Sequence, residues 1–220
     1  MGSAAAAHAS SRGKRVLGLE QFQPAHDQGS SHGRSRVIRL AYFEHPAYVP
    51  LLRRAYELWR RLEDQSGRRL LQITGGLMIG SPDSDVVAGS VRSAREHQLD
   101  HELLDADDIH RRFPPFTPAP GIVALHEHAA GVVFPEEAIR AHLDIAADHG
   151  AHLHFDERVD EWKVTSSGAI EVRTSRSRYE CERLILAPGS WASDVFKIDW
   201  LPLDKFDARQ SASSPECTGS

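Results

Sequence analysis

The first twenty residues present a helix, a turn, a strand and an acidic residue in that order. Residues 4–11 are rich in alanine and favour a helix, Gly13 marks its end, and residues 15–20 form a short apolar run that closes on Glu20. In a dinucleotide-binding βαβ unit, the last glycine of the turn lets helix and strand pack closely, and an acidic residue about 20 positions later holds the ribose. Gly2 and Glu20 are 18 positions apart, which fits that unit. An ordinary helix and a strand ending in an exposed glutamate explain the segment equally well, so both interpretations stay open here.

A polar loop and two arginines follow this strand. Residues 21–33 are turn-formers and polar side chains, and Arg36 and Arg39 come soon after them, three positions apart. If that segment is helical, both arginines project from one face and can converge on an anion or an aromatic ring. A guanidinium suits a carboxylate because it offers paired donors and keeps its charge at every working pH. The alternative is a pair of exposed arginines on a surface turn.

The rest of the chain alternates helical and strand patterns. We expect helices at 46–65, 84–97, 105–113 and 135–150, and strands at 70–80, on both sides of 127–130, and near 152–157, 161–165, 169–174 and 179–186. Alternation followed by several successive strands predicts an α/β nucleotide-binding domain with a partly antiparallel second layer.

The charge, the apolar runs and the cysteine count exclude several classes of function. A net charge of −5 over 220 residues and a pI near 6.2 argue against nucleic-acid and anionic-membrane partners, because those partners need clustered Lys and Arg. No apolar run approaches the roughly 20 residues that span a bilayer, and no secretory leader follows Met1. We therefore expect a soluble, cytoplasmic protein. Cys181 and Cys217 are too few for a disulfide framework, and we expect Cys181 to be a reduced structural thiol.

The histidines raise the question of a metal site. His126 with His128, or His152 with His154, can share one face of a strand, but the spacing supplies neither a third ligand nor a HExxH or CxxC motif. We expect these histidines to be solvated or packed and predict no metal site. No GxSxG motif supports nucleophilic hydrolysis.

Several motifs together resemble one family of flavoenzymes. They are the run 29–42 with Glu20 upstream of it, and the segments 48–51, 75–80, 131–134 and 186–191. The whole stretch from Met1 to Trp191 is similar to the FAD-dependent amine oxidases of the monomeric sarcosine oxidase and N-methyltryptophan oxidase family. The resemblance implies a Rossmann-like FAD/NAD(P)-binding domain with part of an α+β substrate domain.

The resemblance also implies roles for individual residues. Glu20 would hold the adenosine ribose, the loop from Ser30 to Gly33 would wrap the flavin, and His32 would lie near the isoalloxazine. Arg36 would pack on the flavin and assist oxygen chemistry, and Arg39 would bind the substrate carboxylate. The resulting cofactor-binding set is Gly2, Glu20, Ser30, Ser31, His32, Gly33, Arg36, Val159, Gly189 and Trp191. His32 and Arg36 are the implied catalytic residues and Arg39 the implied substrate-binding residue.

The chain departs from the family pattern at three places. Ser31 stands where the family often has His, the first strand and first glycines of the dinucleotide motif are missing, and the family's large antiparallel substrate sheet does not follow after about residue 196. We expect a partial oxidoreductase over 1–203, both of its domains incomplete. Its nucleotide-binding segments would be about 1–45 and 135–200, with substrate-domain and helical segments over about 46–134. The polar, aperiodic residues 204–220 predict a disordered tail.

The reaction implied by the resemblance is oxidation of the C–N bond of an N-methyl amino acid by O2, which gives H2O2, formaldehyde and the amino acid. The expected partners are therefore FAD, such an amine and O2, with the identity of the amine and the oligomeric state left open. A second hypothesis is that this chain is a catalytically inert truncated fragment that at most binds FAD weakly.

Overall fold

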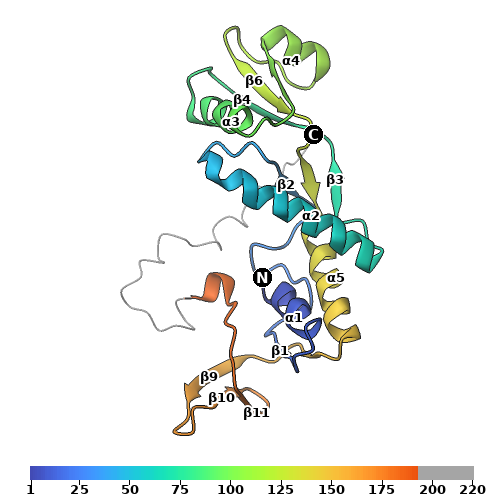
Figure 1. Ribbon diagram of the computed structural model, residues 1–220, viewed down its shortest axis with the longest axis vertical. Coiled ribbons are helices and arrows are strands. Elements are labelled where there is room, and N and C mark those ends of the chain that lie inside the picture. The colour runs from blue at the N-terminus through green and yellow to red at the C-terminus, as the bar shows by residue number, and fades with distance from the viewer. Residues whose placement is uncertain (193–220) are drawn as a thin grey trace, which may run out of the picture. The chain divides into compact units, whose positions relative to one another are not determined.

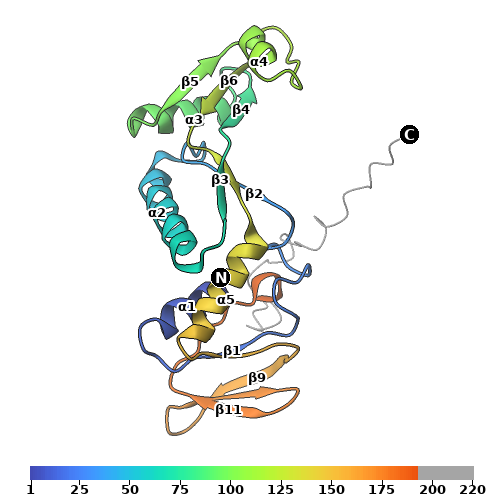
Figure 2. The ribbon, with the colours of Figure 1, turned by 90° about the vertical axis from the view of Figure 1, so that its right-hand side faces the viewer.

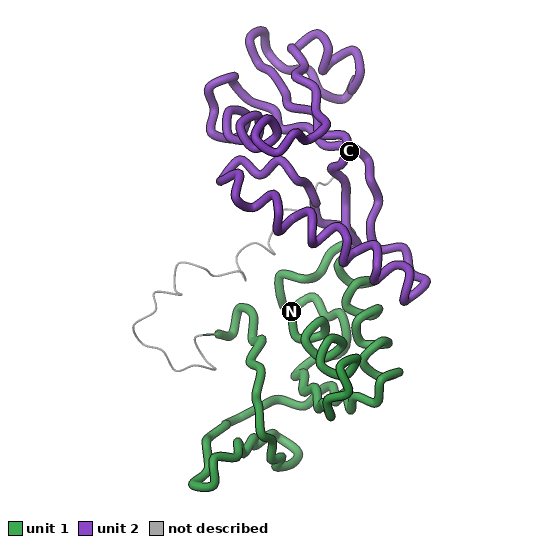
Figure 3. The backbone as a smooth tube through the Cα atoms, viewed as in Figure 1, with its two compact units in different colours: residues 1–34, 135–220 green, residues 35–134 purple. Residues whose placement is uncertain are grey.

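The computed structural model describes residues 1–192, which form parts of two compact units (Figure 3). Unit 1 contains residues 1–34 and the chain from residue 135 onward, and unit 2 contains residues 35–134. Unit 1 is therefore assembled from two segments that are distant in sequence. The expected tail at 204–220 and Cys217 lie outside the described residues.

The described part of the chain is mixed α/β, as predicted (Figure 1). Its α-helices are α1 (Gly2–Ser10), α2 (Val49–Ser66), α3 (Asp85–Glu96), α4 (Ala106–Arg112) and α5 (Pro135–Asp148). Its strands are β1 (Leu17–Leu19), β2 (Arg36–Ile38), β3 (Leu71–Ile73), β4 (Gly76–Gly80), β5 (His101–Leu104), β6 (Val123–Glu127), β7 (Gly131–Val133), β8 (His152–His154), β9 (Val159–Val164), β10 (Ile170–Thr174) and β11 (Arg178–Cys181). Two 3-10 turns, η1 (Pro46–Tyr48) and η2 (Gly189–Trp191), complete the elements. None of the helices described is long and apolar enough to cross a membrane.

Small residues bring the two helices of unit 1 together. Ala6 and Ala7 of α1 and Ala146 of α5 are buried in one apolar cluster. Alanine has no side chain beyond Cβ, so it allows the helices to pack at short range. Next to them, β1 and β8 pair in parallel, with Leu17 opposite His152. An alternating helix and parallel strand pair is the local architecture of a nucleotide-binding α/β fold.

Unit 1 also contains a three-stranded antiparallel sheet, in the order β11–β10–β9 (Figure 1). Val172 of β10 is 4% exposed, whereas every residue of β9 is exposed. The strand predicted at 179–186 ends earlier than expected, at Cys181 of β11. Cys181 is a free thiol.

Unit 2 contains two antiparallel sheets, β2–β7–β3 and β4–β6–β5, with α3 and α4 packed near the second (Figure 2). The prediction of a single strand at 70–80 is wrong in one respect: the segment is divided into β3 and β4, which belong to different sheets. Thr74 and Gly75 separate them, and Gly75 has φ +72°, a left-handed conformation that interrupts a strand and that glycine adopts without strain.

Local capping explains where the helices of unit 2 begin and end. The Ser84 hydroxyl accepts a hydrogen bond from the Val87 N–H at the start of α3, and the Asp105 carboxylate accepts one from the Asp108 N–H at the start of α4. Gly67 ends α2 with φ +66° and donates its N–H to the Glu63 carbonyl.

Candidate cofactor and substrate site

The structure divides the predicted site residues between its two units. All of the candidate cofactor residues except Arg36 lie in unit 1, and Arg36 and Arg39 lie in unit 2.

Gly2, at the beginning of α1, and Glu20, directly after β1, are two of the residues predicted to bind the dinucleotide. Gly2 is the first residue of α1, and a Cβ placed on it would lie 3.6 Å from the Cβ of Ala187, just before Gly189 in the chain. Glu20 directly follows β1, and its N–H donates to the His154 carbonyl at 2.9 Å, which extends the parallel pairing. The Glu20 side chain is 40% exposed, so its carboxylate remains available at the carboxyl end of a parallel strand, where such folds bind ribose.

An aromatic cluster joins Trp191 to the loop after Glu20. The Phe22 ring centroid lies 4.8 Å from that of His26 and 5.6 Å from that of Trp191. His26 also places Nε2 3.8 Å from Glu20 Oε1, and the Phe22 N–H donates to that same carboxylate oxygen at 3.1 Å. Phe22 and His26 are not among the site residues predicted from the sequence. Their only signal was an aromatic ring and an imidazole four residues apart in an otherwise polar loop.

The loop from Ser30 to Gly33 is anchored at its C-terminal end. Gly33 has φ +96° and donates its N–H to Glu136 Oε1 at 2.9 Å. Glu136 lies in the first turn of α5, where a carboxylate is favoured by the helix dipole. His32 contacts the Gly29 carbonyl through Nδ1, while Ser30 and Ser31 are exposed. The loop therefore has a fixed base and a polar, accessible tip.

Glu157 organises the segment that leads to Val159. Its carboxylate is 2% exposed and accepts hydrogen bonds from the Thr174 hydroxyl at 2.7 Å and the Tyr179 hydroxyl at 2.8 Å. His154 Nδ1 lies 3.0 Å from its second oxygen. The Glu157 N–H donates to the Glu20 carbonyl at 2.9 Å, so the same residue links β1 to the antiparallel sheet. Val159, at the start of β9, is 37% exposed.

This network makes the stability of unit 1 dependent on pH. The hydrogen bond from Thr174, followed by those from Tyr179 and His154, outweighs desolvation and lowers the pKa of Glu157. A lowered folded-state pKa contributes stability above the unfolded-state value, and that stability is lost as pH falls through the folded-state pKa. We expect the difference in free energy of unfolding between the wild type and Glu157→Gln to be constant near neutral pH and to shrink below about pH 4.3, the ordinary glutamate value. Urea unfolding from pH 7 to pH 3 measures it, with exposed Glu161→Gln as the control. A difference that stays unchanged down to pH 3 would contradict the role of the ionised carboxylate.

The two arginines of unit 2 lie on and just after a strand, so the conditional expectation of a helix is wrong. Arg36 begins β2 and pairs with Val133 of β7, and Arg39 follows the end of that strand. Side chains alternate along an extended segment, so positions three apart point to opposite sides rather than to one face. The structure accordingly leaves Arg36 exposed, with Nη1 donating to the Ser35 carbonyl at 2.8 Å, and Arg39 mostly buried.

Arg39 carries a hydrogen-bond donor that is not used within residues 1–192. Its guanidinium lies over the rings of Tyr42 and Phe43, with Cζ 4.8 Å and 5.4 Å from their centroids, and Nη2 is 3.8 Å from Glu44 Oε2. The Nε atom is buried and has no hydrogen-bond partner among the described residues. Because an unsatisfied buried donor is costly, this arrangement is suited to an anionic ligand that accepts its hydrogen bond.

The chain directly after Arg39 is held by three buried polar side chains. Glu127 is fully buried, and its two oxygens accept the N–H groups of Leu40 at 2.7 Å and Ala41 at 2.8 Å. From α3, the Ser90 hydroxyl donates to the Ala41 carbonyl at 3.1 Å and the Ser93 hydroxyl to the Tyr42 carbonyl. None of the three residues was predicted from the sequence, because their partners are backbone groups 49 to 87 positions away in the chain.

Comparison with known proteins identifies the family. The model of the family described as FAD dependent oxidoreductase matches residues 1–208. Over 195 residues the chain is 52% identical to a monomeric sarcosine oxidase of Streptomyces avermitilis, covering 89% of this chain and 50% of that protein. It is 31% identical to an N-methyl-L-tryptophan oxidase of Yersinia pestis, covering 89% of this chain and 52% of that protein.

A solved structure supports the same assignment. NikD, an unusual amino acid oxidase essential for nikkomycin biosynthesis, superposes with a TM-score of 0.82 at 27% identity, over 89% of this chain and 50% of NikD. The chain thus spans about half the length of the relatives it matches. The resemblance seen in the sequence motifs is confirmed, and the chain belongs to the FAD dependent oxidoreductase family.

Proposed function

We propose that this chain binds FAD and takes part in oxidation of the C–N bond of a small N-methyl amino acid. The buried Nε of Arg39, which has no hydrogen-bond partner among residues 1–192, is the observation that carries the substrate half of this proposal, since it suits a carboxylate. Family membership and the similarity to enzymes named sarcosine oxidase and N-methyl-L-tryptophan oxidase support the cofactor and the reaction type. The chain spans about half the length of those relatives, so we also propose, and do not take from them, that this chain contributes to the complete reaction.

Unit 1 would hold the cofactor. Glu20 would accept the ribose hydroxyls, because its carboxylate is partly exposed at the end of a parallel strand. The start of α1 at Gly2 would face the pyrophosphate, since helix N-termini carry free N–H groups and a positive dipole end. The remaining cofactor-contacting residues would be Ser30, Ser31, His32, Gly33, Val159, Gly189 and Trp191.

Unit 2 would supply the arginines. Arg39 would orient the substrate by its carboxylate, and Arg36, with His32 of unit 1, would tune the surroundings of the flavin and its reaction with oxygen. When bound, the flavin supplies the redox chemistry: it takes a hydride equivalent from the amine and passes the electrons to O2. The O2 that receives the electrons would leave as H2O2, and the imine product would separately react with water to give formaldehyde and the amino acid.

The visible absorption of the chain after incubation with FAD and gel filtration tests the cofactor half. We expect flavin bands to elute with the protein. A colourless protein would overturn FAD binding by this chain and favour the alternative that it is an inert fragment. For a protein that retains flavin, release of H2O2 on addition of sarcosine or N-methyltryptophan tests the reaction.

The substrate half is tested with Arg39→Ala. Loss of a charge-assisted hydrogen bond costs about 1.5–3 kcal/mol, so the concentration of sarcosine needed for half-maximal response should rise about tenfold or more. The response is H2O2 release, or the shift of the flavin spectrum on adding sarcosine to the anaerobic protein. Flavin content should not change. Arg61→Ala removes an exposed arginine of α2 and serves as the control. An unchanged sarcosine response in Arg39→Ala would remove Arg39 from the carboxylate site.

A further inference from the structure

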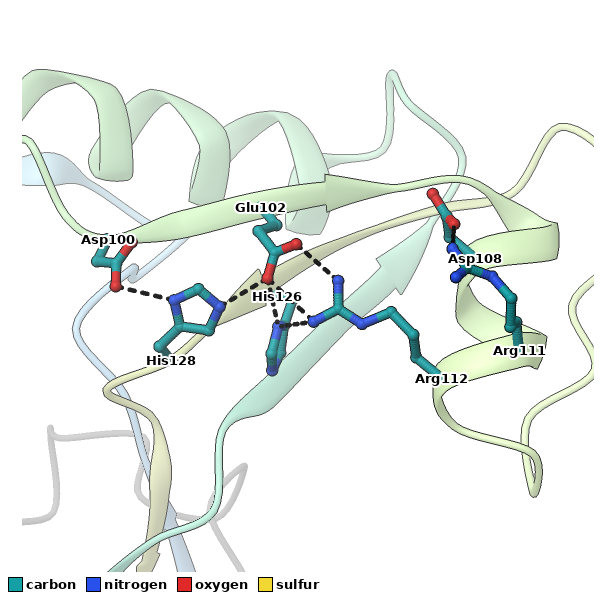
Figure 4. A network of polar contacts seen from close by, with 7 residues as sticks. All are labelled: Asp100, Glu102, Asp108, Arg111, Arg112, His126 and His128. Atoms are coloured by element: carbon teal, nitrogen blue, oxygen red, sulfur yellow. Dashed lines mark hydrogen bonds and ion pairs between the residues drawn. The ribbon is translucent and has the colours of Figure 1, made fainter.

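Two histidines and a glutamate of unit 2 converge on the sheet β4–β6–β5 (Figure 4). Glu102 of β5 and His126 of β6 are register partners in the antiparallel pair, and His128 follows β6 by one residue. Side chains of directly opposed residues share one face of the sheet, which is why Glu102 and His126 meet. Neither histidine is near Glu102 in sequence, so spacing alone could not supply this third group.

The distances within this cluster are short. Glu102 Oε1 lies 2.7 Å from His128 Nε2 and 3.5 Å from His126 Nδ1. One atom from each of the three residues can be chosen so that all lie within 4.8 Å of one another. In tetrahedral zinc sites with bonds of about 2.0 Å, neighbouring ligand atoms lie about 3.3 Å apart. The observed separations, from 2.7 Å to at most 4.8 Å, lie on both sides of that value, so the side chains would move by up to about 1.5 Å relative to one another to bind an ion tetrahedrally.

A second carboxylate orients one of the histidines. Asp100 Oδ2 lies 2.9 Å from His128 Nδ1, on the far side of the ring from Glu102 (Figure 4). A carboxylate bound to one imidazole nitrogen fixes the tautomer and directs the lone pair of the other nitrogen, an arrangement that recurs around metal-bound histidines. His126 is held more rigidly, because its side chain is 10% exposed and its ring lies edge-on to that of Phe113 at 5.3 Å.

A cation already lies beside these groups. Arg112, the last residue of α4, donates Nη1 to Glu102 Oε2 at 2.6 Å and Nη2 to Glu102 Oε1 at 3.0 Å. Its Nη2 is also 3.4 Å from His126 Nδ1. The guanidinium therefore contacts two of the three candidate ligand atoms. Its side chain is 32% exposed, so it has access to solvent and can be displaced.

We propose that Glu102, His126 and His128 form a binding site for a divalent transition-metal ion of the zinc class, in competition with the Arg112 guanidinium. Two imidazole nitrogens and one carboxylate oxygen are ligands that Zn²⁺ and Co²⁺ accept, and a fourth position is left for water. Since the ligands come from β5, from β6 and from the residue directly after β6, the ion would link these segments. This site is distinct from the residues assigned to FAD and to the amine.

Titration of the metal-free chain with Co²⁺ and Zn²⁺ tests the site. We expect saturable uptake of one Co²⁺ per chain with visible d–d absorption of a four-coordinate ion, displacement of that ion by Zn²⁺, and a higher melting temperature with Zn²⁺. Uptake without the four-coordinate spectrum, or no saturable uptake, would overturn the proposal.

Three variants assign the binding to this cluster. His128→Ala removes a ligand that is 38% exposed and should weaken Co²⁺ binding at least about tenfold. Arg112→Gln removes the competing cation and should tighten binding, which no loss of folding can imitate. His152→Ala removes an exposed histidine of β8 and should change nothing. Unchanged binding in His128→Ala, or weaker binding in Arg112→Gln, would show that the ion binds elsewhere.

Discussion

Glu127→Gln is expected to lower the free energy of unfolding of unit 2 by about 3 kcal/mol. Each oxygen of the buried carboxylate accepts one backbone N–H, from Leu40 and from Ala41. Glutamine has nearly the same shape, but it replaces one acceptor with an NH2 group that faces an N–H donor. One backbone group is then left buried without a partner, and the other loses the added strength of a charged acceptor.

The loss of stability in Glu127→Gln can be measured both by hydrogen exchange at the amides that Glu127 binds and over the whole protein. The Leu40 and Ala41 amides should lose protection in Glu127→Gln, and urea unfolding should report the lower stability. Glu57→Gln is the matched control, because Glu57 is an exposed residue of α2 paired with Arg54 at 2.6 Å, and its loss should change stability by no more than about 0.5 kcal/mol. Equal stability of the two variants would contradict the anchoring role of Glu127.

The hydrogen bonds of Glu127 to Leu40 and Ala41 also affect the proposed substrate site. Leu40 directly follows Arg39, so the hydrogen bonds of Glu127 begin at the very next residue. A guanidinium recognises a carboxylate by geometry, and this geometry requires a fixed backbone. If Arg39 orients the substrate, Glu127→Gln should also weaken substrate binding, although Glu127 need not touch the substrate.

Local patterns predicted much of the fold. The helix expected at 84–97 is α3, and the helix expected from Pro135 corresponds to α5. Both could be predicted because an amphipathic period, a capping serine and an N-terminal proline depend only on residues that are close in sequence. The α/β class followed from the same periodicities. The division of 70–80 into two strands was missed, since membership of a sheet depends on distant partners.

Fewer residues of the candidate site could be predicted from local sequence patterns. Glu20 was selected as a candidate by its spacing from Gly2, and Arg39 by the family resemblance. Glu127 and Glu157 were not found, because a carboxylate buried by backbone or hydroxyl donors from remote segments looks in the sequence like any surface acid. Their significance arises only when the chain is folded.

Gly89→Ala is expected to destabilise unit 2 by about 2 kcal/mol, although alanine is the better helix former. Gly89 lies inside α3, and a Cβ built on it would come within 2.2 Å of the Phe43 carbonyl oxygen and 2.9 Å of its carbonyl carbon. Because the contact is with backbone, no side-chain rotation relieves it. The helix would have to move away from the segment that Ser90 and Ser93 bind, and those two hydrogen bonds would lengthen.

The sign of the change decides between the two effects. Helix propensity alone predicts that alanine stabilises α3 by about 1 kcal/mol, whereas the close approach of Phe43 predicts the opposite. Gly29→Ala is the control for the chemical change itself, because a Cβ there meets its nearest atom, of His26, at 3.6 Å, an ordinary contact. Thermal unfolding of both variants gives the sign directly. A stabilised Gly89→Ala protein would mean that α3 does not lie against the chain after Arg39 and that Ser90 and Ser93 do not hold that segment in place.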